Sequence, residues 1–591
     1  MSIKKNFNYK DYSKIAKEID KVDSRKLLKK IHINFFSNFT AELLDSCIQV
    51  EFEAKGFYVK NSFFSYGSID ENILGNYNFS KEANQIFFFH FRTEDYFLDL
   101  GSDLLNNNKE KLIEIVDQKL IHLNSLFKTI RHNNSCNIFI SNFSNVSLNL
   151  YETLENSFSF TQSDLINYIN NELRILVNKF SSIYIFDYFS FTSKVGIYNL
   201  YDEKMWLMAR FPFKSKYNAM LVKAYIRFIL SSIVTPKKCL VCDLDNTLWG
   251  GTLGENNKNS ISLGDDFPGN IYKNFQQTIL NLKQMGVFLA VVSKNNEKDV
   301  YDFINGNQEC LLKAKDFSLI KSNWKDKATN IIEISEELNI GLDSIVFFDD
   351  NPMEREWVKN QLPDVNVIDV PENPIYFKEA LINSNFFDKT TITKEDKKRP
   401  QLFADEKSRK KHLKSFSNYD EFLKSLKMKI FLKKATIKDV PRVTQLINKV
   451  NQFNLTVKRS NEEKVLSLLS TKDCIYTIRL EDKFGDFGTV GVIIFKYQKQ
   501  GVWEIDNFLL SCRALGRKVE NLSLSYILNI LQKENNEKVI GSFTPGDKNE
   551  QTKDFYKNMG FSFNKEIEKW VWELNKNKSE NFNLAEVSYF E

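Results

Sequence analysis

The fold of this chain is decided by one stretch, Lys238-Cys239-Leu240-Val241-Cys242-Asp243-Leu244-Asp245-Asn246-Thr247-Leu248-Trp249-Gly250-Gly251. An apolar run of strand type ends there in two carboxylates spaced by one residue. Side chains alternate along an extended chain, so Asp243 and Asp245 lie on the same side of it. Two carboxylates that close repel each other unless a cation lies between them. A hard divalent ion, most simply Mg²⁺, fits that need, and an acidic surface turn is the alternative.

Composition indicates a globular protein of several domains. The 591 residues predict three or four domains, at roughly 150 to 200 residues each. With 42% hydrophobic residues and only 21 Gly and 10 Pro, the chain is neither fibrous nor of low complexity. The net charge of +5 comes from interspersed Lys rather than from a basic block. Binding of nucleic acid therefore gains little support.

The sequence predicts a cytoplasmic protein with reduced thiols. The first residues, Met-Ser-Ile-Lys-Lys-Asn, do not begin a signal peptide, and no apolar run of about 18 residues could span a membrane. The pair Cys239-x-x-Cys242 has the spacing of a zinc or redox site, but both residues lie on an apolar strand and no second pair follows. We expect buried, reduced cysteines.

The first domain is expected over residues 31–235, after a helical lead at 1–30. Strands at 30–36, 85–91, 136–141 and 182–187 alternate with helices, a pattern that predicts a parallel, doubly wound sheet. This region resembles the SGNH hydrolases, with Ser37-Asn38-Phe39 where those enzymes carry Gly-Asp-Ser. The late Asp-x-x-His of that family is missing, since 202–205 reads Asp-Glu-Lys-Met and no His occurs between His132 and His412. A Ser without a base is a poor nucleophile, so we expect a docking or covering role.

The second domain, residues 236–375, repeats the pattern of polar residues at strand ends. Ser293 follows the apolar run 287–292, and Asp349-Asp350 follow the run 344–348. Lys327 opens a helix expected over 325–338. Because ligand sites of open α/β sheets lie at the carboxyl ends of strands, these side chains are predicted to meet Asp243.

These four motifs, in this order, resemble those of the haloacid dehalogenase superfamily. The resemblance implies that Asp243 is the nucleophile and a Mg²⁺ ligand, and that Asp245 is the general acid and base. Lys327 would neutralise developing charge. The implied metal ligands are Asp243, Asp245, Asp349 and Asp350. The implied phosphate- or substrate-binding residues are Thr247, Ser293, Lys294 and Asn295.

Little sequence separates the motifs, so no cap domain is expected. The site is then open, and either the substrate is large or another domain shields it. Three segments, Trp249 to Glu255, Ser293 to Asn296 and Asp349 to Arg355, resemble the FkbH-like subfamily, over roughly residues 30 to 565. Those proteins load a glyceryl unit from 1,3-bisphosphoglycerate onto an acyl carrier protein, with loss of phosphate.

A Lys-rich connector, expected to be solvated, spans 376–427 and leads to a third domain at 428–575 and a tail at 576–591. Mixed strands and the segment 511–520, which is expected to open a long helix, resemble the N-acetyltransferase (GNAT) fold, of α+β class. Such folds hold the pyrophosphate of coenzyme A on helix amides at Arg-x-x-Gly-x-Gly/Ala. Arg513, Gly516 and Arg517 fit that motif, whereas Lys518 replaces its last small residue.

Cys512 is the expected acyl acceptor. It lies beside Arg513 ahead of the predicted helix, two features that activate a thiol, although a small buried Cys is the ordinary alternative. Cys242 is the second candidate.

The sequence thus predicts an FkbH-like transferase that passes a three-carbon acyl unit from 1,3-bisphosphoglycerate through Cys512 to the phosphopantetheine of a separate carrier protein or to another acceptor, such as a sugar. The alternatives are a Mg²⁺-dependent phosphatase acting on a macromolecular or sugar phosphate, and a scaffold without activity.

Overall fold

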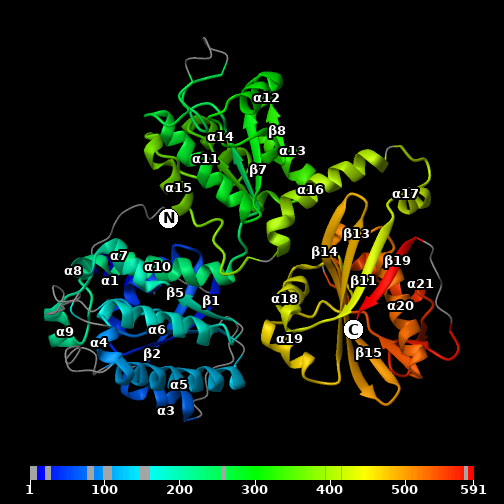
Figure 1. The fold of residues 1–591 in the computed structure, drawn as a ribbon, viewed down its shortest axis with the longest axis horizontal. Helices are drawn as coiled ribbons and strands as arrows, with labels where there is room; N and C mark the ends of the chain where they lie inside the picture. The colour runs from blue at the N-terminus through cyan, green and yellow to red at the C-terminus, as the bar shows by residue number, and fades with distance from the viewer. Residues whose placement is uncertain are drawn as a thin grey trace. The chain divides into compact units, whose positions relative to one another are not determined.

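The computed structural model describes residues 9–19, 28–64, 66–75, 85–97, 109–134, 136–145, 157, 160–180, 182–253, 261–392, 394–413, 415–546, 548–577 and 584–590 (Figure 1). The chain forms two compact units, Met1–Val234 and Thr235–Glu591. In the described part of the chain, none of the helices has the length and apolar character needed to cross a membrane.

The N-terminal unit is a doubly wound parallel sheet. Its strands are β1 (Lys29–Ser37), β2 (Phe57–Phe64), β3 (Gln85–His90), β4 (Asn137–Ser141) and β5 (Ile183–Phe186). Its helices are α1 (Tyr9–Ile19), α2 (Asp45–Glu53), α3 (Ile69–Leu74), α4 (Thr93–Tyr96), α5 (Lys109–Asn133), α6 (Gln162–Val177), α7 (Tyr188–Val195), α8 (Ile197–Leu200), α9 (Glu203–Ala209) and α10 (Ser215–Ile233). The order β2-β1-β3-β4-β5 is a common doubly wound order.

Alternation along the strands divides the core of this unit between two faces. Phe35 and Phe88 pack against α1, α2 and α10, whereas Phe36 and Phe89 pack against α5 and α6. The pattern of alternating strands and helices predicted this sheet, except for β2. That strand ends in residues that are only half-buried, so it lacks the continuous apolar run that marks its neighbours.

The second unit begins with another five-stranded parallel sheet. Its strands are β6 (Cys239–Cys242), β7 (Phe288–Ser293), β8 (Leu319–Ser322), β9 (Ile345–Phe348) and β10 (Asn366–Val367). Its helices are α11 (Gly269–Gln284), α12 (Glu297–Gly306), α13 (Lys327–Leu338), α14 (Pro352–Gln361) and α15 (Phe377–Asn383). The strand order is β10-β9-β6-β7-β8. Helices α11, α12 and α15 cover one face, and α13 and α14 cover the other.

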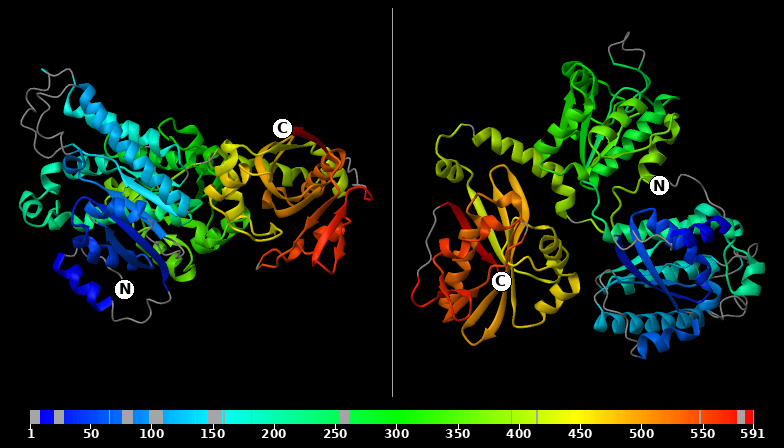
Figure 2. Two further views of the ribbon diagram at one scale, coloured as in Figure 1. Left: turned by 90° about the horizontal axis from the view of Figure 1, so that it is seen from below. Right: turned by 180° about the vertical axis from the view of Figure 1, so that it is seen from behind.

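The chain ends in a mixed sheet of order β17-β18-β16-β15-β14-β13-β11-β19, in which β12 pairs with β15 (Figures 1 and 2). The strands are β11 (Met428–Lys434), β12 (Phe453–Asn454), β13 (Cys474–Asp482), β14 (Gly485–Lys499), β15 (Val502–Leu510), β16 (Lys538–Gly541), β17 (Ser562–Asn564), β18 (Lys569–Glu573) and β19 (Ala585–Phe590). The helices are α18 (Val440–Lys449), α19 (Glu462–Leu469), α20 (Val519–Lys533) and α21 (Phe555–Asn558). Strand β19 pairs with β11, so the sheet extends into the segment expected to be a tail.

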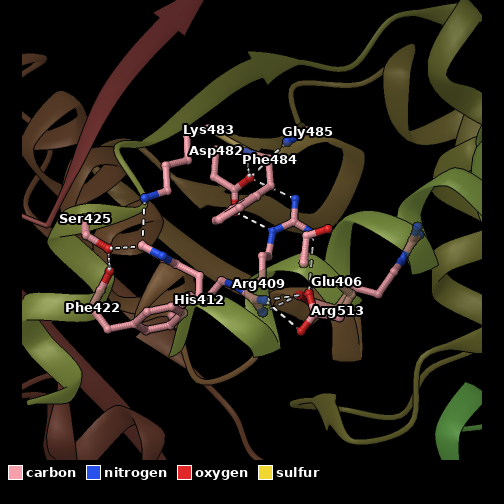
Figure 3. Close-up of polar contacts among 12 residues, drawn as sticks. Glu406, Arg409, His412, Phe422, Ser425, Asp482, Lys483, Phe484, Gly485 and Arg513 are labelled. Atoms are coloured by element: carbon pink, nitrogen blue, oxygen red, sulfur yellow. Dashed lines mark hydrogen bonds and ion pairs between the residues drawn. The ribbon is translucent and has the colours of Figure 1, made fainter. Parts of the chain in front are cut away.

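Two further helices, α16 (Lys394–Leu413) and α17 (Tyr419–Ser425), precede this sheet. Not every charged side chain of α16 is exposed to solvent. Arg409 of α16 is only 1% exposed and donates from Nε and Nη2 to the carboxylate of Asp482, at 2.6 and 2.8 Å (Figure 3). Its guanidinium lies 4.0 Å from the centroid of the Phe487 ring. The connector was expected to be solvated because its composition is strongly charged, and composition does not reveal that one of its cations is buried and paired.

We predict that Arg409→Met lowers the free energy of unfolding of the C-terminal sheet by about 3–5 kcal/mol, because it leaves the buried Asp482 carboxylate without its cation. Urea denaturation followed by tryptophan fluorescence measures the change. Lys411→Met on the same helix is the control, and we expect an effect within about 0.5 kcal/mol since Lys411 is exposed. Equal stability of the two variants would show that the pair contributes nothing.

Candidate active site

The candidate site lies where the order of the strands in the second sheet reverses direction. β6 lies between β7 and β9, and Asp243 and Asp349 directly follow the adjacent parallel strands β6 and β9. The amide of Asp243 donates to the carbonyl of Phe348 at 3.0 Å, which fixes the two strand ends beside each other. Ligand sites of open α/β sheets lie at such switch points.

Three carboxylates meet at this point. Asp243, Asp349 and Asp350 each offer an oxygen within 4.8 Å of the others, and the first two are buried. Burial raises the pKa of Asp243 to about 6, with Lys327 opposing the shift and Asp349 adding to it. Burial likewise raises the pKa values of Asp349 and Asp350. A buried group of hard oxygen donors that repel one another is the donor set that suits Mg²⁺.

Lys327 supplies the positive charge of the site. It is the first residue of α13, whose N-cap Asp326 accepts a hydrogen bond from the amide of Thr329. Its Nζ lies 2.6 Å from Asp349 Oδ2 and 3.1 Å from Asp243 Oδ1. Burial lowers the pKa of Lys327, but the two carboxylates raise it more, so the net pKa lies above the ordinary value. The ammonium therefore stays charged between the two carboxylates.

The predicted phosphate-binding residues lie on the same edge of the sheet. Ser293 ends β7 and is 2% exposed. Thr247 is fully buried, and its hydroxyl donates to Asp350 Oδ1 at 2.9 Å. Lys294 is half-exposed and pairs with Glu354 at 2.6 Å. Thr247 is therefore hydrogen-bonded to one of the three carboxylates, and Lys294 is paired with a residue of α14. Ser293 lies at the end of β7.

Asp245 lies outside the group of three carboxylates, although the sequence places it among the metal ligands. Its Oδ1 accepts hydrogen bonds from Trp249 Nε1 at 2.9 Å and from the amide of Leu253 at 3.0 Å. Its Oδ2 accepts one from Asn295 Nδ2 at 2.8 Å. The predicted substrate-binding residue Asn295 therefore contacts the predicted acid–base residue directly, and a metal-binding role for Asp245 stays a prediction.

Two residues of the quoted motifs have roles that the sequence did not assign. Arg355, which is 8% exposed, donates from Nη1 to the carbonyls of Asp349 and Asp350, at 2.8 and 2.7 Å. It holds the backbone that carries two members of the carboxylate group. The sequence could have indicated this role, because Arg355 lies in the first turn of α14, shortly after those two residues. Trp249, whose indole N–H donates to Asp245, is the second residue with such a role.

The C-terminal loop departs from the expected helix start. Cys512 begins a single turn of 3₁₀ helix over 512–514, and α20 begins only at Val519. Gly516 and Lys518 adopt left-handed backbone conformations, with φ of 77° and 58°, and these interrupt the helix. Cys512 is exposed but lies several residues ahead of the α20 terminus, so one of the two arguments for its activation is wrong.

The residues predicted to bind pyrophosphate are engaged by the chain itself. Arg517 donates to the carbonyl of Arg513 at 2.6 Å and to Glu406 of α16 at 3.0 Å. The hydroxyl of Tyr419 donates to the carbonyl of Gly516 at 3.0 Å. Figure 3 shows Glu406 and Arg409 of α16 beside this region. The positive charge of Arg517 is therefore already paired with a carboxylate.

Neither thiol candidate joins the carboxylate group. Cys512 belongs to the 3₁₀ turn that precedes α20, outside the sheet that carries the three carboxylates. Cys242 is 2% exposed, and burial raises its pKa well above the ordinary value. Its thiol is packed in the apolar core.

In the N-terminal unit, the strand-end serine Ser37 bonds within its own turn. Ser37 Oγ donates to the carbonyl of Phe39 at 2.7 Å. Its cross-strand neighbour His90 is buried and forms a 2.6 Å hydrogen bond between Nδ1 and the hydroxyl of Tyr225. Burial lowers the pKa of His90 to about 3, so the ring is neutral. The docking or covering role of this domain stays a prediction.

Comparison with known proteins identifies a shared fold. No family model and no curated protein matches the chain. The chain is similar to the N-terminal part of protein BF1531 from Bacteroides fragilis, containing a phosphatase domain complexed with Mg. The two are 23% identical, with a TM-score of 0.56, over 65% of this chain and 100% of that one. That 65% of the chain therefore shares the fold of the Bacteroides fragment.

Two acetyltransferases are also similar over shorter stretches. An N-acetyltransferase from Staphylococcus aureus Mu50 is 12% identical over 24% of this chain and 98% of its own, with a TM-score of 0.19. An IAA acetyltransferase from Bacillus cereus ATCC 14579 is 12% identical over 23% of this chain and 78% of its own, with a TM-score of 0.18.

We predict that Mg²⁺ raises the melting temperature more at about pH 7.5 than at about pH 5. Because the pKa of Asp243 is raised to about 6, protons compete with the ion as the pH falls through that value. An ion present at 100 times its Kd stabilises the folded state by about 2.7 kcal/mol. Differential scanning fluorimetry with and without Mg²⁺ measures this, with Asp243→Asn as the control. An equal shift at both pH values, or in the control, would contradict binding at this group.

Proposed function

We propose that the chain is a Mg²⁺-dependent phosphatase or phosphotransferase of the haloacid dehalogenase type. One observation carries the proposal. The Lys327 ammonium lies between Asp243 and Asp349 at the switch point of a doubly wound sheet, beside a third carboxylate and the buried Ser293. A nucleophile, a fixed cation and an acidic metal-binding group are thus together where phosphoryl transfer requires them. The same arrangement argues against an inactive scaffold.

The residues divide the chemistry as follows. Asp243 attacks phosphorus through a carboxylate oxygen, and Asp245 supplies the proton that the departing oxygen needs. Lys327 offsets the negative charge that builds up on the phosphoryl oxygens. Mg²⁺, held by Asp243, Asp349 and Asp350, would neutralise further charge on the phosphoryl group.

The substrate is either large or covered when bound. Between Ser293 and Lys327 the chain holds α12, β8 and their connecting segments, with no separate cap domain. We propose for the N-terminal unit the docking or covering role that an open site requires. The plain phosphatase, acting on a macromolecular or sugar phosphate, needs nothing beyond this site.

A second candidate function is transfer of a three-carbon acyl unit. It rests on the FkbH-like motifs and on the exposure of Cys512. In this proposal Asp243 removes the ester phosphate at C3 of 1,3-bisphosphoglycerate, and the Cys512 thiolate attacks the acyl carbon at C1 and expels the second phosphate. The acyl group then passes to the phosphopantetheine thiol of a separate carrier protein or to another acceptor. The pairing of Arg517 with Glu406 leaves that loop less positive than the motif alone suggests.

We predict that Asp243→Asn abolishes phosphate release, with a loss on the order of 10⁴-fold or more, because the nucleophile is removed. Lys327→Met should lower kcat about 10²- to 10³-fold, since it removes a fixed charge. Inorganic phosphate released from p-nitrophenyl phosphate and from sugar phosphates is the measurement. Lys325→Met is the matched control, because Lys325 pairs only with the peripheral Glu333 and should retain activity. Full activity in Asp243→Asn would refute the proposal.

The acyl-transfer candidate predicts a covalent adduct. After incubation with 1,3-bisphosphoglycerate and Mg²⁺, intact-protein mass spectrometry should show one glyceryl unit, which peptide mapping should place on Cys512. Cys512→Ala should lose the adduct but still release phosphate from generic esters. An adduct on another residue, or its persistence in Cys512→Ala, would rule out Cys512 as the acceptor.

A further inference from the structure

The turn after β6 folds back onto its own carboxylate. Asn246 adopts a left-handed conformation, with φ of 53°, and its side chain accepts a hydrogen bond from the amide of Gly251 at 2.9 Å. This closes the segment that follows Asp245 into a tight loop. The closure brings the indole of Trp249 and the amide of Leu253 to the side chain of Asp245.

The three hydrogen bonds to the Asp245 carboxylate are divided unequally between its two oxygens. A carboxylate oxygen accepts two hydrogen bonds in its own plane, one for each lone pair. Oδ1 accepts from both Trp249 and Leu253, so both of its positions are filled. Among the described residues, Oδ2 accepts from Asn295 alone, which leaves one position open. A proton carried by this side chain therefore sits on Oδ2.

Trp249 and Asn295 are themselves held in place. Trp249 is fully buried, and its ring lies 4.8 Å from that of Phe303 on α12. Asn295 is 7% exposed, and its Nδ2 also lies 3.1 Å from Ser293 Oγ. The same amide thus connects the predicted phosphate-binding hydroxyl to the acid–base carboxylate. Neither donor can turn away without disrupting packing or this link.

We infer that Trp249 and Asn295 are positioning residues, which fix the Asp245 carboxyl so that Oδ2 delivers its proton to the leaving oxygen. This inference rests on the proposed phosphatase function. As Asp243 attacks, the bond between phosphorus and the leaving oxygen breaks, and its electron pair goes to that oxygen, which takes the proton from Oδ2. Water then attacks the phosphoaspartyl group and returns a proton to Oδ2. Asp243 is regenerated, and inorganic phosphate leaves.

The test compares two esters that differ in their need for that proton. p-Nitrophenolate leaves as a stable anion, whereas the alkoxide of glycerol phosphate must be protonated as it departs. Trp249→Phe keeps the ring but removes the N–H donor. We expect the ratio of kcat/KM for p-nitrophenyl phosphate to kcat/KM for glycerol phosphate to rise about tenfold or more over wild type, since acid catalysis contributes 10²- to 10⁴-fold.

The ratio separates positioning from a general structural effect. Weaker folding or weaker phosphate binding lowers kcat/KM for both esters alike, so it cancels. Asn295→Ala is the second variant, with the same expected direction, and it decides the matter if Trp249→Phe does not fold. Trp570→Phe is the matched control, because it makes the same change on β18 of the C-terminal sheet, and its ratio should equal that of wild type.

Two results would overturn the inference in distinguishable ways. Unchanged ratios in both positioning variants, with an active wild type, contradict the role of Trp249 and Asn295 and leave the phosphatase standing. A wild-type protein that releases phosphate from neither ester in the presence of Mg²⁺ contradicts the proposed function, and the inference fails with it.

Discussion

Mutual repulsion among three carboxylates is the constraint on which the second unit depends. Asp243, Asp349 and Asp350 lie together because β6 and β9 are adjacent and parallel, and each strand ends in acid. Packed together without positive charge, such residues would destabilise the fold. The structure offsets part of the repulsion with the Lys327 ammonium and leaves the rest for a divalent cation. The same excess of negative charge that the fold must tolerate is what suits this site to a metal ion.

The surroundings of these carboxylates are built to hold them rigidly. Arg355 fixes the backbone after β9, Thr247 fixes Asp350, and Asp326 caps the helix that presents Lys327. The predicted acid–base residue has different surroundings. Asp245 lies outside the group of three carboxylates and accepts hydrogen bonds from neutral donors, an indole, a main-chain amide and a side-chain amide. Asp243 and Asp245, which are separated by one residue, therefore lie in different environments, and this suits different roles.

The sequence predicted that Asp243, Lys327 and Asp349-Asp350 would lie together because the relevant information is local. Strand ends, the order of the motifs and helix starts such as Pro352 are legible in a single chain, and parallel strands bring their ends together. What it could not predict depends on contacts between distant residues. The burial of Arg409 requires Asp482, and the pairing of Arg517 requires Glu406. Likewise, α20 starts later than expected because Gly516 and Lys518 have left-handed backbone conformations, and the sequence did not predict these.

The central claim is that Asp243 accepts the phosphoryl group. Trapping that intermediate tests it most directly. Reduction of a rapidly quenched reaction with borohydride converts a phosphoaspartyl residue into homoserine, which peptide mass spectrometry can place. The account predicts homoserine at position 243, dependent on both Mg²⁺ and the phosphate donor. Homoserine at another position, or steady phosphate release with no modified aspartate, would contradict it.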